Sequence, residues 1–164
     1  MKHAAQPIPP GYHTVTASLT VRDAAAAIEF YKKALGAEEL NRMAGPDGKI
    51  GHAELKIGDS IIFLNDEMGM GCKSPQTLGG ASGSLYLYVE DVDSAFQRAI
   101  DAGGKSNMPV TDMFWGDRFG GFVDPYGHFW GLSTRIHDLT QEEIEEGSRN
   151  FWAEMAQQTQ KKSA

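Results

Sequence analysis

Cysteine is almost absent from this sequence, since Cys72 is the only one among 164 residues. A single cysteine cannot form an intramolecular disulfide, and no Cys-x-x-Cys or Cys/His spacing surrounds it. A disulfide scaffold and a zinc-ribbon site are therefore excluded. The glycine-rich surroundings of Cys72 indicate an ordinary loop thiol.

Basic residues are also scarce, with 15 Lys and Arg against 22 Asp and Glu and a formal net charge of -7. Binding to a phosphate backbone requires a concentrated basic surface. Nucleic acid is therefore not expected as a partner.

Long hydrophobic runs are missing as well. No stretch approaches the roughly 20 apolar residues of a membrane-spanning helix, and the opening MKHAAQPIPP lacks the apolar core of a signal peptide. We expect no membrane partner and a cytoplasmic location. The motifs GxSxG, Walker A and strand-linked GxGxxG are likewise absent, which leaves no familiar nucleophile or nucleotide site.

The chain does contain an internal repeat, at an offset of 68 residues from Leu19 to Leu87. Leu19-Thr-Val-Arg-Asp23 recurs as Leu87-Tyr-Val-Glu-Asp91. Self-similarity at a fixed offset indicates two copies of one structural unit.

Each copy begins with the alternating apolar residues of a half-buried strand, which are Val15, Ala17, Leu19 and Val21 in the first and Leu85, Leu87 and Val89 in the second. An aspartate then stands at a helix N-cap position, Asp23 or Asp91, before apolar residues at helical spacing. Hairpin patterns follow around the turns 58–60 and 124–127. The pattern predicts an α+β fold of paired βαβββ modules, at about 12–66 and 83–135. The glycine-rich connection 66–82 is expected to be mobile.

A further helix is predicted after the second module. Thr140-Gln-Glu-Glu143 has the form of a capping box, and Ile144, Phe151 and Met155 fall on one helical face. This helix packs either on its own domain or on a second subunit, and the apolar Trp152 suits both arrangements.

The strand faces opposite the predicted core are polar. Because strand side chains alternate, one face of the first strand carries only hydroxyls, at Thr14, Thr16, Ser18 and Thr20. The equivalent face of the second copy carries Ser84, Tyr86 and Tyr88, and the hairpin strand adds His52, Glu54 and Lys56. Hydroxyls mixed with aromatic rings, including Phe63, suit a pocket for a small molecule between the halves.

These features resemble the vicinal-oxygen-chelate superfamily, of the glyoxalase/bleomycin-resistance/dioxygenase type. The resemblance is carried by the paired modules, by Val21-Arg-Asp with Phe30-Tyr-Lys-Lys-Ala-Leu-Gly36, and by Asp124-Pro-Tyr-Gly-His128. The stretches 51–60 and 112–120 are most similar to the PhnB-like branch. The resemblance implies a domain over residues 1–137, with an added helix and tail at 138–164.

Members of this superfamily that use a metal take its ligands from the first and last strands of each module, usually as histidine and carboxylate. In this chain the resemblance places those positions at Thr16, Phe63, Ser84 and Gly131. Neither residue type is present there, so we expect no metal at the usual site and no cofactor.

His52 and Glu54 are the candidate catalytic residues. They are two apart on a strand, so their side chains point the same way, and Glu54 would orient His52 as a general base. They also offer two ligands to a displaced metal, which would need a third from elsewhere. A structural hydrogen bond between them is the plain alternative.

The segment 114–118 offers an aromatic ring and a cation, Trp115 and Arg118. A guanidinium grips a carboxylate or phosphate in bidentate fashion, so Arg118 is the predicted anion contact at the mouth of a cleft with His52, Glu54 and Tyr86. The structural alternative buries Trp115 and pairs Arg118 with Asp117 or Asp124.

The sequence favours a small-molecule-binding protein, with an aromatic or anionic ligand. The candidate ligand-binding residues are Thr16, Ser18, His52, Glu54, Phe63, Ser84, Tyr86, Trp115 and Arg118. The alternatives are a metal-dependent lyase or dioxygenase with relocated ligands, and a metal-free acid/base enzyme using His52 and Glu54. The resemblance also implies a homodimer, since members of this fold commonly pair, with modules of two chains completing one barrel.

Overall fold

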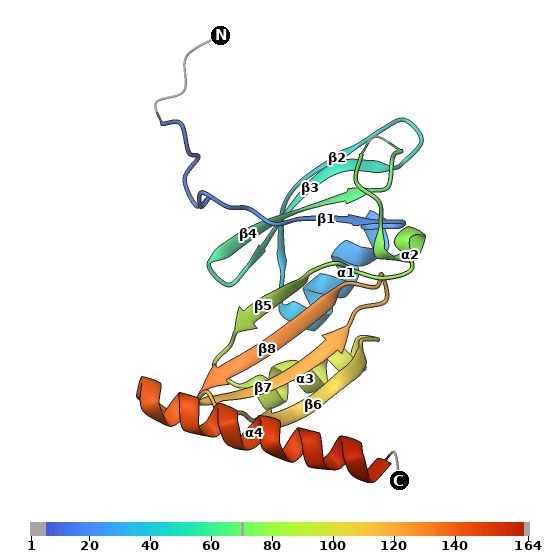
Figure 1. The fold of residues 1–164 in the computed structure, drawn as a ribbon. Coiled ribbons are helices and arrows are strands. Elements are labelled where there is room, and N and C mark those ends of the chain that lie inside the picture. Colours follow the sequence, from blue (N-terminus) through green and yellow to red (C-terminus); the bar gives the residue numbers. More distant parts are fainter. Residues whose placement is uncertain (1–5, 70, 163–164) are drawn as a thin grey trace.

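The computed structural model describes residues 6–69 and 71–162, with side chains as far as residue 157. It has two four-stranded mixed sheets with helices (Figure 1), which confirms the predicted α+β fold of paired βαβββ modules. The first module consists of β1 (Ser18–Val21), α1 (Ala24–Leu35), β2 (Glu38–Ala44), β3 (Ile50–Ile57) and β4 (Ser60–Asp66). The second consists of β5 (Ser84–Tyr88), α3 (Val92–Asp101), β6 (Lys105–Asp112), β7 (Asp117–Val123) and β8 (Phe129–Arg135).

The two sheets have the same topology. Sheet A has the strand order β1-β4-β3-β2 and sheet B the order β5-β8-β7-β6. In each sheet the first strand pairs with the last strand in parallel, and the other pairs are antiparallel. The repeat seen in the sequence is thus a repeat of topology.

The aspartates predicted to cap the helices do so. The Asp23 side chain accepts a hydrogen bond from the backbone N–H of Ala26, and Asp91 accepts one from that of Ser94. Each bond satisfies one of the N–H groups that a helix leaves unpaired in its first turn. The caps fix where the chain changes from strand to helix in each module.

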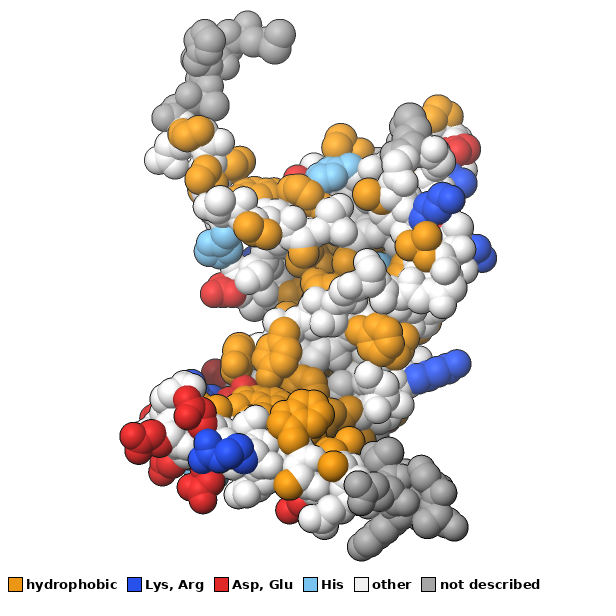
Figure 2. Space-filling model, in the orientation of Figure 1, with side chains coloured by type: hydrophobic (Ala, Val, Ile, Leu, Met, Phe, Trp, Pro, Cys, Tyr) orange, Lys and Arg blue, Asp and Glu red, His pale blue; other side chains and the backbone are white. Residues whose placement is uncertain are grey.

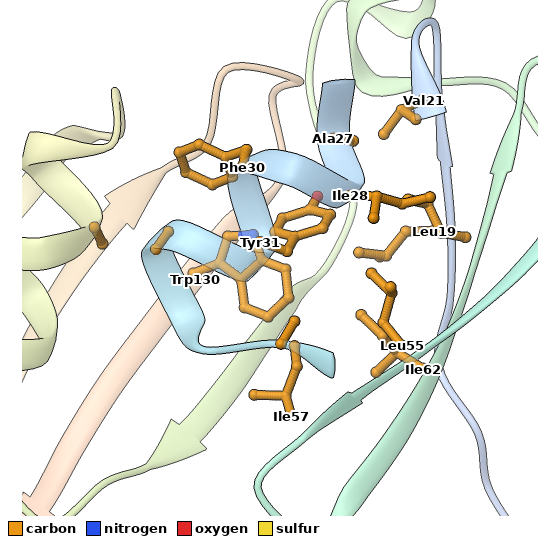
Figure 3. Close-up of a cluster of buried hydrophobic side chains, with 14 of the residues drawn as sticks. Leu19, Val21, Ala27, Ile28, Phe30, Tyr31, Leu55, Ile57, Ile62 and Trp130 are labelled. Atoms are coloured by element: carbon orange, nitrogen blue, oxygen red, sulfur yellow. The ribbon is translucent and has the colours of Figure 1, made fainter. Parts of the chain in front are cut away.

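One core joins the two modules (Figure 3). Ile28, Leu55 and Leu64 from the first module and Trp130 from the second are at most 1% exposed. Tyr31 on α1 lies against Trp130 on β8, with ring centroids 5.3 Å apart. Because the helix-bearing faces of both sheets contribute to this core, the other two faces point away from it. We call these the open faces of sheets A and B.

Strand β1 is shorter than the alternation predicts. Val15, expected on the core side, is 84% exposed. The parallel register with β4 begins only at Ser18, opposite Phe63, so Val15 has no neighbouring strand to hold it against the core. Residues 6–17 instead form an arm that leads into the sheet.

The connection between the modules contains a short helix, α2 (Pro75–Leu78). Glu67 holds it, because its carboxylate accepts hydrogen bonds from the Ser74 backbone N–H at 3.1 Å, the Ser74 hydroxyl at 2.6 Å and the Thr77 hydroxyl at 2.7 Å. These bonds lower the pKa of Glu67 from 4.5 to about 2. The segment thus carries more local structure than its glycine content indicates.

The helix predicted after the second module is α4 (Gln141–Lys162). Its capping box forms, since the Thr140 N–H donates to the Glu143 carboxylate at 2.7 Å. Gly147 packs closely on Phe114, whose ring also lies 5.5 Å from that of Phe151. The first half of α4 therefore packs on its own domain, while Trp152 remains 64% exposed. No helix in the described part of the chain is long and apolar enough to cross a membrane.

Candidate functional site

The open face of sheet A carries His52 and Glu54 from β3. Both are partly exposed, whereas their neighbours Ala53 and Leu55 are fully buried in the core. This confirms that strand alternation turns His52 and Glu54 away from the helix. Phe63 on β4 pairs with Glu54 in register and lies on the same face.

His52 and Glu54 interact directly, with 3.2 Å between His52 Nε2 and Glu54 Oε1. The His52 ring also meets Phe63 edge-on, at 4.8 Å between centroids. Hydrogen bonds from Tyr12, and then from His52, lower the pKa of Glu54, while the same bond to Glu54 raises the pKa of Tyr12. Glu54 is thus held in its ionised form between two partners.

Tyr12 is a site residue that sequence reasoning missed. It lies in the arm of residues 6–17, outside any strand or helix. Its ring packs on Phe63 at 6.0 Å and its hydroxyl bonds to Glu54. No periodic pattern in the sequence signals this contact, because it depends on how an irregular segment crosses the sheet.

The arm and sheet A together line an open cavity of about 450 Å³. Glu54 and Phe63 line it from the sheet, and Tyr12, Thr14 and Thr16 line it from the arm together with Pro7, Ile8, Pro9 and His13. Ser18 pairs in register with Phe63, which puts it on the same face. Of the candidates predicted on this half, Thr16, Glu54 and Phe63 line the cavity, while His52 and Ser18 lie on the same face outside its lining.

The open face of sheet B is an aromatic surface. Tyr86 on β5 stacks on Phe119 of β7, with centroids 5.4 Å apart and planes inclined by 14°. Beneath the rings, a Cβ on Gly131 would come within 2.8 Å of Phe119 and 3.0 Å of Tyr86. Glycine at this position leaves the room that both rings occupy. Figure 2 shows hydrophobic side chains gathered in the lower half of the view, beside α4.

A buried carboxylate holds these tyrosines in place. Asp117 is 3% exposed and accepts hydrogen bonds from the hydroxyls of Tyr86 at 3.4 Å, Tyr88 at 3.1 Å and Ser133 at 2.9 Å. The bond to Asp117 raises the pKa of Tyr88. Asp117 was not among the predicted site residues. The sequence did not show that Asp117, and not its neighbour Arg118, faces this surface.

A second cavity, of about 390 Å³, lies over this surface. Its lining includes Ser84, Tyr86, Phe119 and Phe129, with Asn107 and Met108 from β6. No charged side chain contributes to it among the residues that the structure describes there. The cavity suits a flat, largely apolar ligand.

Trp115 and Arg118 lie apart from each other. The Trp115 ring contacts Phe119 at 6.2 Å and so extends the aromatic surface of sheet B. Arg118 grips Asp93 of α3 in bidentate fashion, at 2.6 and 2.8 Å, and bonds Asp112 at 2.7 Å.

This corrects the expectation that Arg118 lies at the mouth of a cleft with Tyr86. Because strand residues alternate, Asp117 takes the open face and Arg118 the helix face. Its donors are occupied by two aspartates, Asp93 and Asp112.

In the part of one chain that the structure describes, the candidates do not line the expected single cleft between the halves. Thr16, Glu54 and Phe63 line one cavity, Ser84 and Tyr86 line another, and the two linings share no residue. A third cavity, of about 810 Å³, lies between the modules at β5 and the turn 58–60, and includes Tyr86 and Tyr88 but neither His52 nor Glu54. The shared core separates the open faces. Strand alternation predicts which residues share a face, but it does not predict whether two faces meet.

The positions that the resemblance assigns to metal ligands carry no suitable donors. Thr16 and Phe63 line the first cavity, and Ser84 and Gly131 line the second. Two hydroxyls, a phenyl ring and a glycine do not fit a divalent transition metal, which takes imidazole, thiolate or carboxylate. Within residues 6–69 and 71–157, no group of three or more His, Cys, Asp or Glu side chains is placed to hold a metal ion.

Comparison with known proteins agrees with the geometry. The sequence profile of the Glyoxalase/Bleomycin resistance protein/Dioxygenase superfamily matches residues 12–132. An uncharacterized protein of Mycobacterium tuberculosis is 44% identical over 131 residues, which are 77% of this chain and 77% of that protein.

The fold is shared with solved structures, among them TioX and a PhnB protein. TioX from Micromonospora has a TM-score of 0.60 at 26% identity, over 76% of this chain and 99% of that one. A PhnB protein from Bacillus cereus, described as a putative 3-demethylubiquinone-9 3-methyltransferase, has a TM-score of 0.60 at 20% identity, over 74% of this chain and 99% of that one. The profile ends before α4 begins at Gln141.

Proposed function

Because this chain belongs to the glyoxalase/bleomycin resistance/dioxygenase superfamily, we propose that it binds a small, flat aromatic molecule on the open faces of its sheets, without a divalent metal. The observation that carries the proposal is the surface made by Tyr86 and Phe119, whose rings stack with centroids 5.4 Å apart and line a cavity of about 390 Å³. A ligand ring would extend this stack, since offset stacking is a preferred arrangement of aromatic groups.

The surface is preorganised for such a ligand. Asp117 fixes the hydroxyls of Tyr86 and Tyr88, so the rings lose little further freedom when a ligand binds. Ser84 and Asn107 add hydrogen-bonding groups at the rim of the cavity. Trp115, reached through Phe119, widens the aromatic surface.

We also propose that the working form is a homodimer. In one chain the two open faces point away from a shared core, and Tyr86 and Tyr88 remain 45% and 68% exposed. A second copy that set its sheet A face against sheet B of the first would cover these rings. It would also bring His52, Glu54 and Thr16 opposite the aromatic surface, in one enclosed site.

Native mass spectrometry of protein purified without added metal tests the assembly and the absence of metal together. We expect the mass of a dimer with no transition-metal ion attached, because the positions at Thr16, Phe63, Ser84 and Gly131 offer no suitable donors. A monomer at micromolar concentration would refute the dimer. One zinc, nickel, iron or manganese ion per chain, retained after dialysis, would refute the metal-free site.

Indole is a suitable neutral probe of the aromatic surface. We expect it to bind in a ligand-observed NMR titration, and Tyr86→Ala to weaken that binding about fivefold, since an aromatic pair contributes roughly 0.5–1.5 kcal/mol beyond the area it buries. Trp152→Ala is the matched control, because it removes an exposed ring of α4. If indole binds Tyr86→Ala as tightly as wild type, its site is not the aromatic surface of sheet B.

A second candidate function is a metal-free acid/base enzyme, favoured by the 3.2 Å contact between His52 and Glu54. In that case Glu54 would orient the imidazole, which would take a proton from the substrate. The two functions differ in what His52→Ala does once a ligand is known. An enzyme would lose turnover while still binding its substrate, whereas a binding protein would lose only affinity.

A further inference from the structure

The charges around the two open-face cavities have one sign. Glu54 is the only Asp or Glu, and no Lys or Arg appears, among the described residues that line either cavity. His13 lies at the rim of the first cavity, and Lys56 shares the strand face of Glu54 but is exposed and outside that lining. Arg118, the cation expected here, is held on the far side of sheet B by Asp93 and Asp112.

The surroundings of Glu54 suit a positive ligand. Its side chain is 22% exposed, so it is partly withdrawn from water yet open to the cavity. The rings of Tyr12 and Phe63 form aromatic walls beside it, and Thr14 and Thr16 add hydroxyl groups. A carboxylate accepts several hydrogen bonds, so the bonds to Tyr12 and His52 leave capacity for another donor.

We propose that the cavity on the open face of sheet A takes an organic cation, a protonated amine or a guanidinium group, with Glu54 as its counter-ion. The cation donates charge-assisted hydrogen bonds to Glu54 and lies against the faces of Tyr12 and Phe63. The formal net charge of -7 attracts the same class of ligand over longer range. This inference rests on the proposed small-molecule function and specifies its ligand as aromatic and cationic.

Two probes of matched size test the sign of the charge. Phenethylamine and 3-phenylpropanoate both carry a phenyl ring on a short chain, but at pH 7 the first is a cation and the second an anion. We expect phenethylamine to bind wild-type protein at least about tenfold more tightly in ligand-observed NMR titrations, because a charge-assisted hydrogen bond at a partly desolvated carboxylate is strong.

Glu54→Gln should weaken phenethylamine binding about tenfold, equivalent to about 1.4 kcal/mol, and leave 3-phenylpropanoate binding unchanged or stronger. Glu38→Gln is the matched control. Glu38 is exposed and pairs with Lys56, so it lies on the same face of sheet A as Glu54. The substitution therefore removes the same charge from the same face. It should change the affinity for phenethylamine by less than about twofold, since exposed charges are screened by salt. Melting curves of both variants verify that they fold.

The outcomes separate this inference from the proposed function. If 3-phenylpropanoate binds as tightly as phenethylamine, or if Glu54→Gln binds phenethylamine like wild type, the cation site is refuted while small-molecule binding stands. If neither these probes nor indole bind at millimolar concentration, both proposals are refuted. Tenfold preference for the amine that disappears in Glu54→Gln supports both.

Discussion

Replacing Asp124 with alanine is expected to lower the free energy of unfolding by about 3 to 5 kcal/mol, because it leaves buried donors without a partner. Asp124 is 4% exposed. It accepts hydrogen bonds from the Tyr31 hydroxyl at 2.7 Å and from Trp130 Nε1 at 2.9 Å. Burial, followed by the charge of Asp124, raises the pKa of Tyr31 well above 10.0, which keeps this hydroxyl protonated and donating at neutral pH.

Tyr31 comes from the first module and Asp124 from the second, so the bond between them joins the two halves. Urea unfolding measures the effect. Asp101→Ala, at an exposed site on α3, is the control and should change stability by less than about 0.5 kcal/mol.

A double-mutant cycle isolates the bond itself. Tyr31→Phe should be destabilising in the wild-type background but nearly neutral beside Asp124→Ala, since removing both partners of a buried bond costs far less than removing one. Equal costs of Tyr31→Phe in the two backgrounds would show that the bond does not link the modules energetically.

Trp130→Ala is expected to cost about 3 to 5 kcal/mol as well, for a different reason. The Trp130 ring is 1% exposed and packs against Tyr31 at 5.3 Å and Phe122 at 6.4 Å. Truncation leaves a cavity that the neighbouring rings cannot fill, so both transfer energy and packing are lost. Calorimetry or urea unfolding gives the magnitude.

Trp152→Ala provides the matched control for this prediction. It removes the same side chain from α4, where Trp152 is 64% exposed, and should cost less than about 1 kcal/mol. Comparable costs at the two positions would contradict the assignment of Trp130 to the core that joins the modules. Trp130 also contributes to the lining of the cavity on sheet B. Its replacement by alanine should therefore weaken indole binding as well, because the lining of that cavity is disturbed.

The sequence by itself determined the fold, because the fold depends on local and periodic features. Strand alternation, the caps at Asp23 and Asp91, and the repeat from Leu19 to Leu87 are all encoded within short segments. The same alternation was enough to turn His52 and Glu54 away from the core. The acidic composition and the lack of metal-binding residue types at the inherited positions could also be read directly.

Only the tertiary structure decided which side chains share a site. Tyr12 reaches Glu54 through an arm with no periodicity. Arg118 reaches Asp93 and Asp112 on the helix face because it alternates along β7 with Asp117, whose side chain takes the open face. The two open faces lie apart because Tyr31, Trp130 and Asp124 join the modules through the opposite, helix-bearing faces. Such contacts join residues far apart in the chain, and their free energies depend on packing in three dimensions, which no local pattern records.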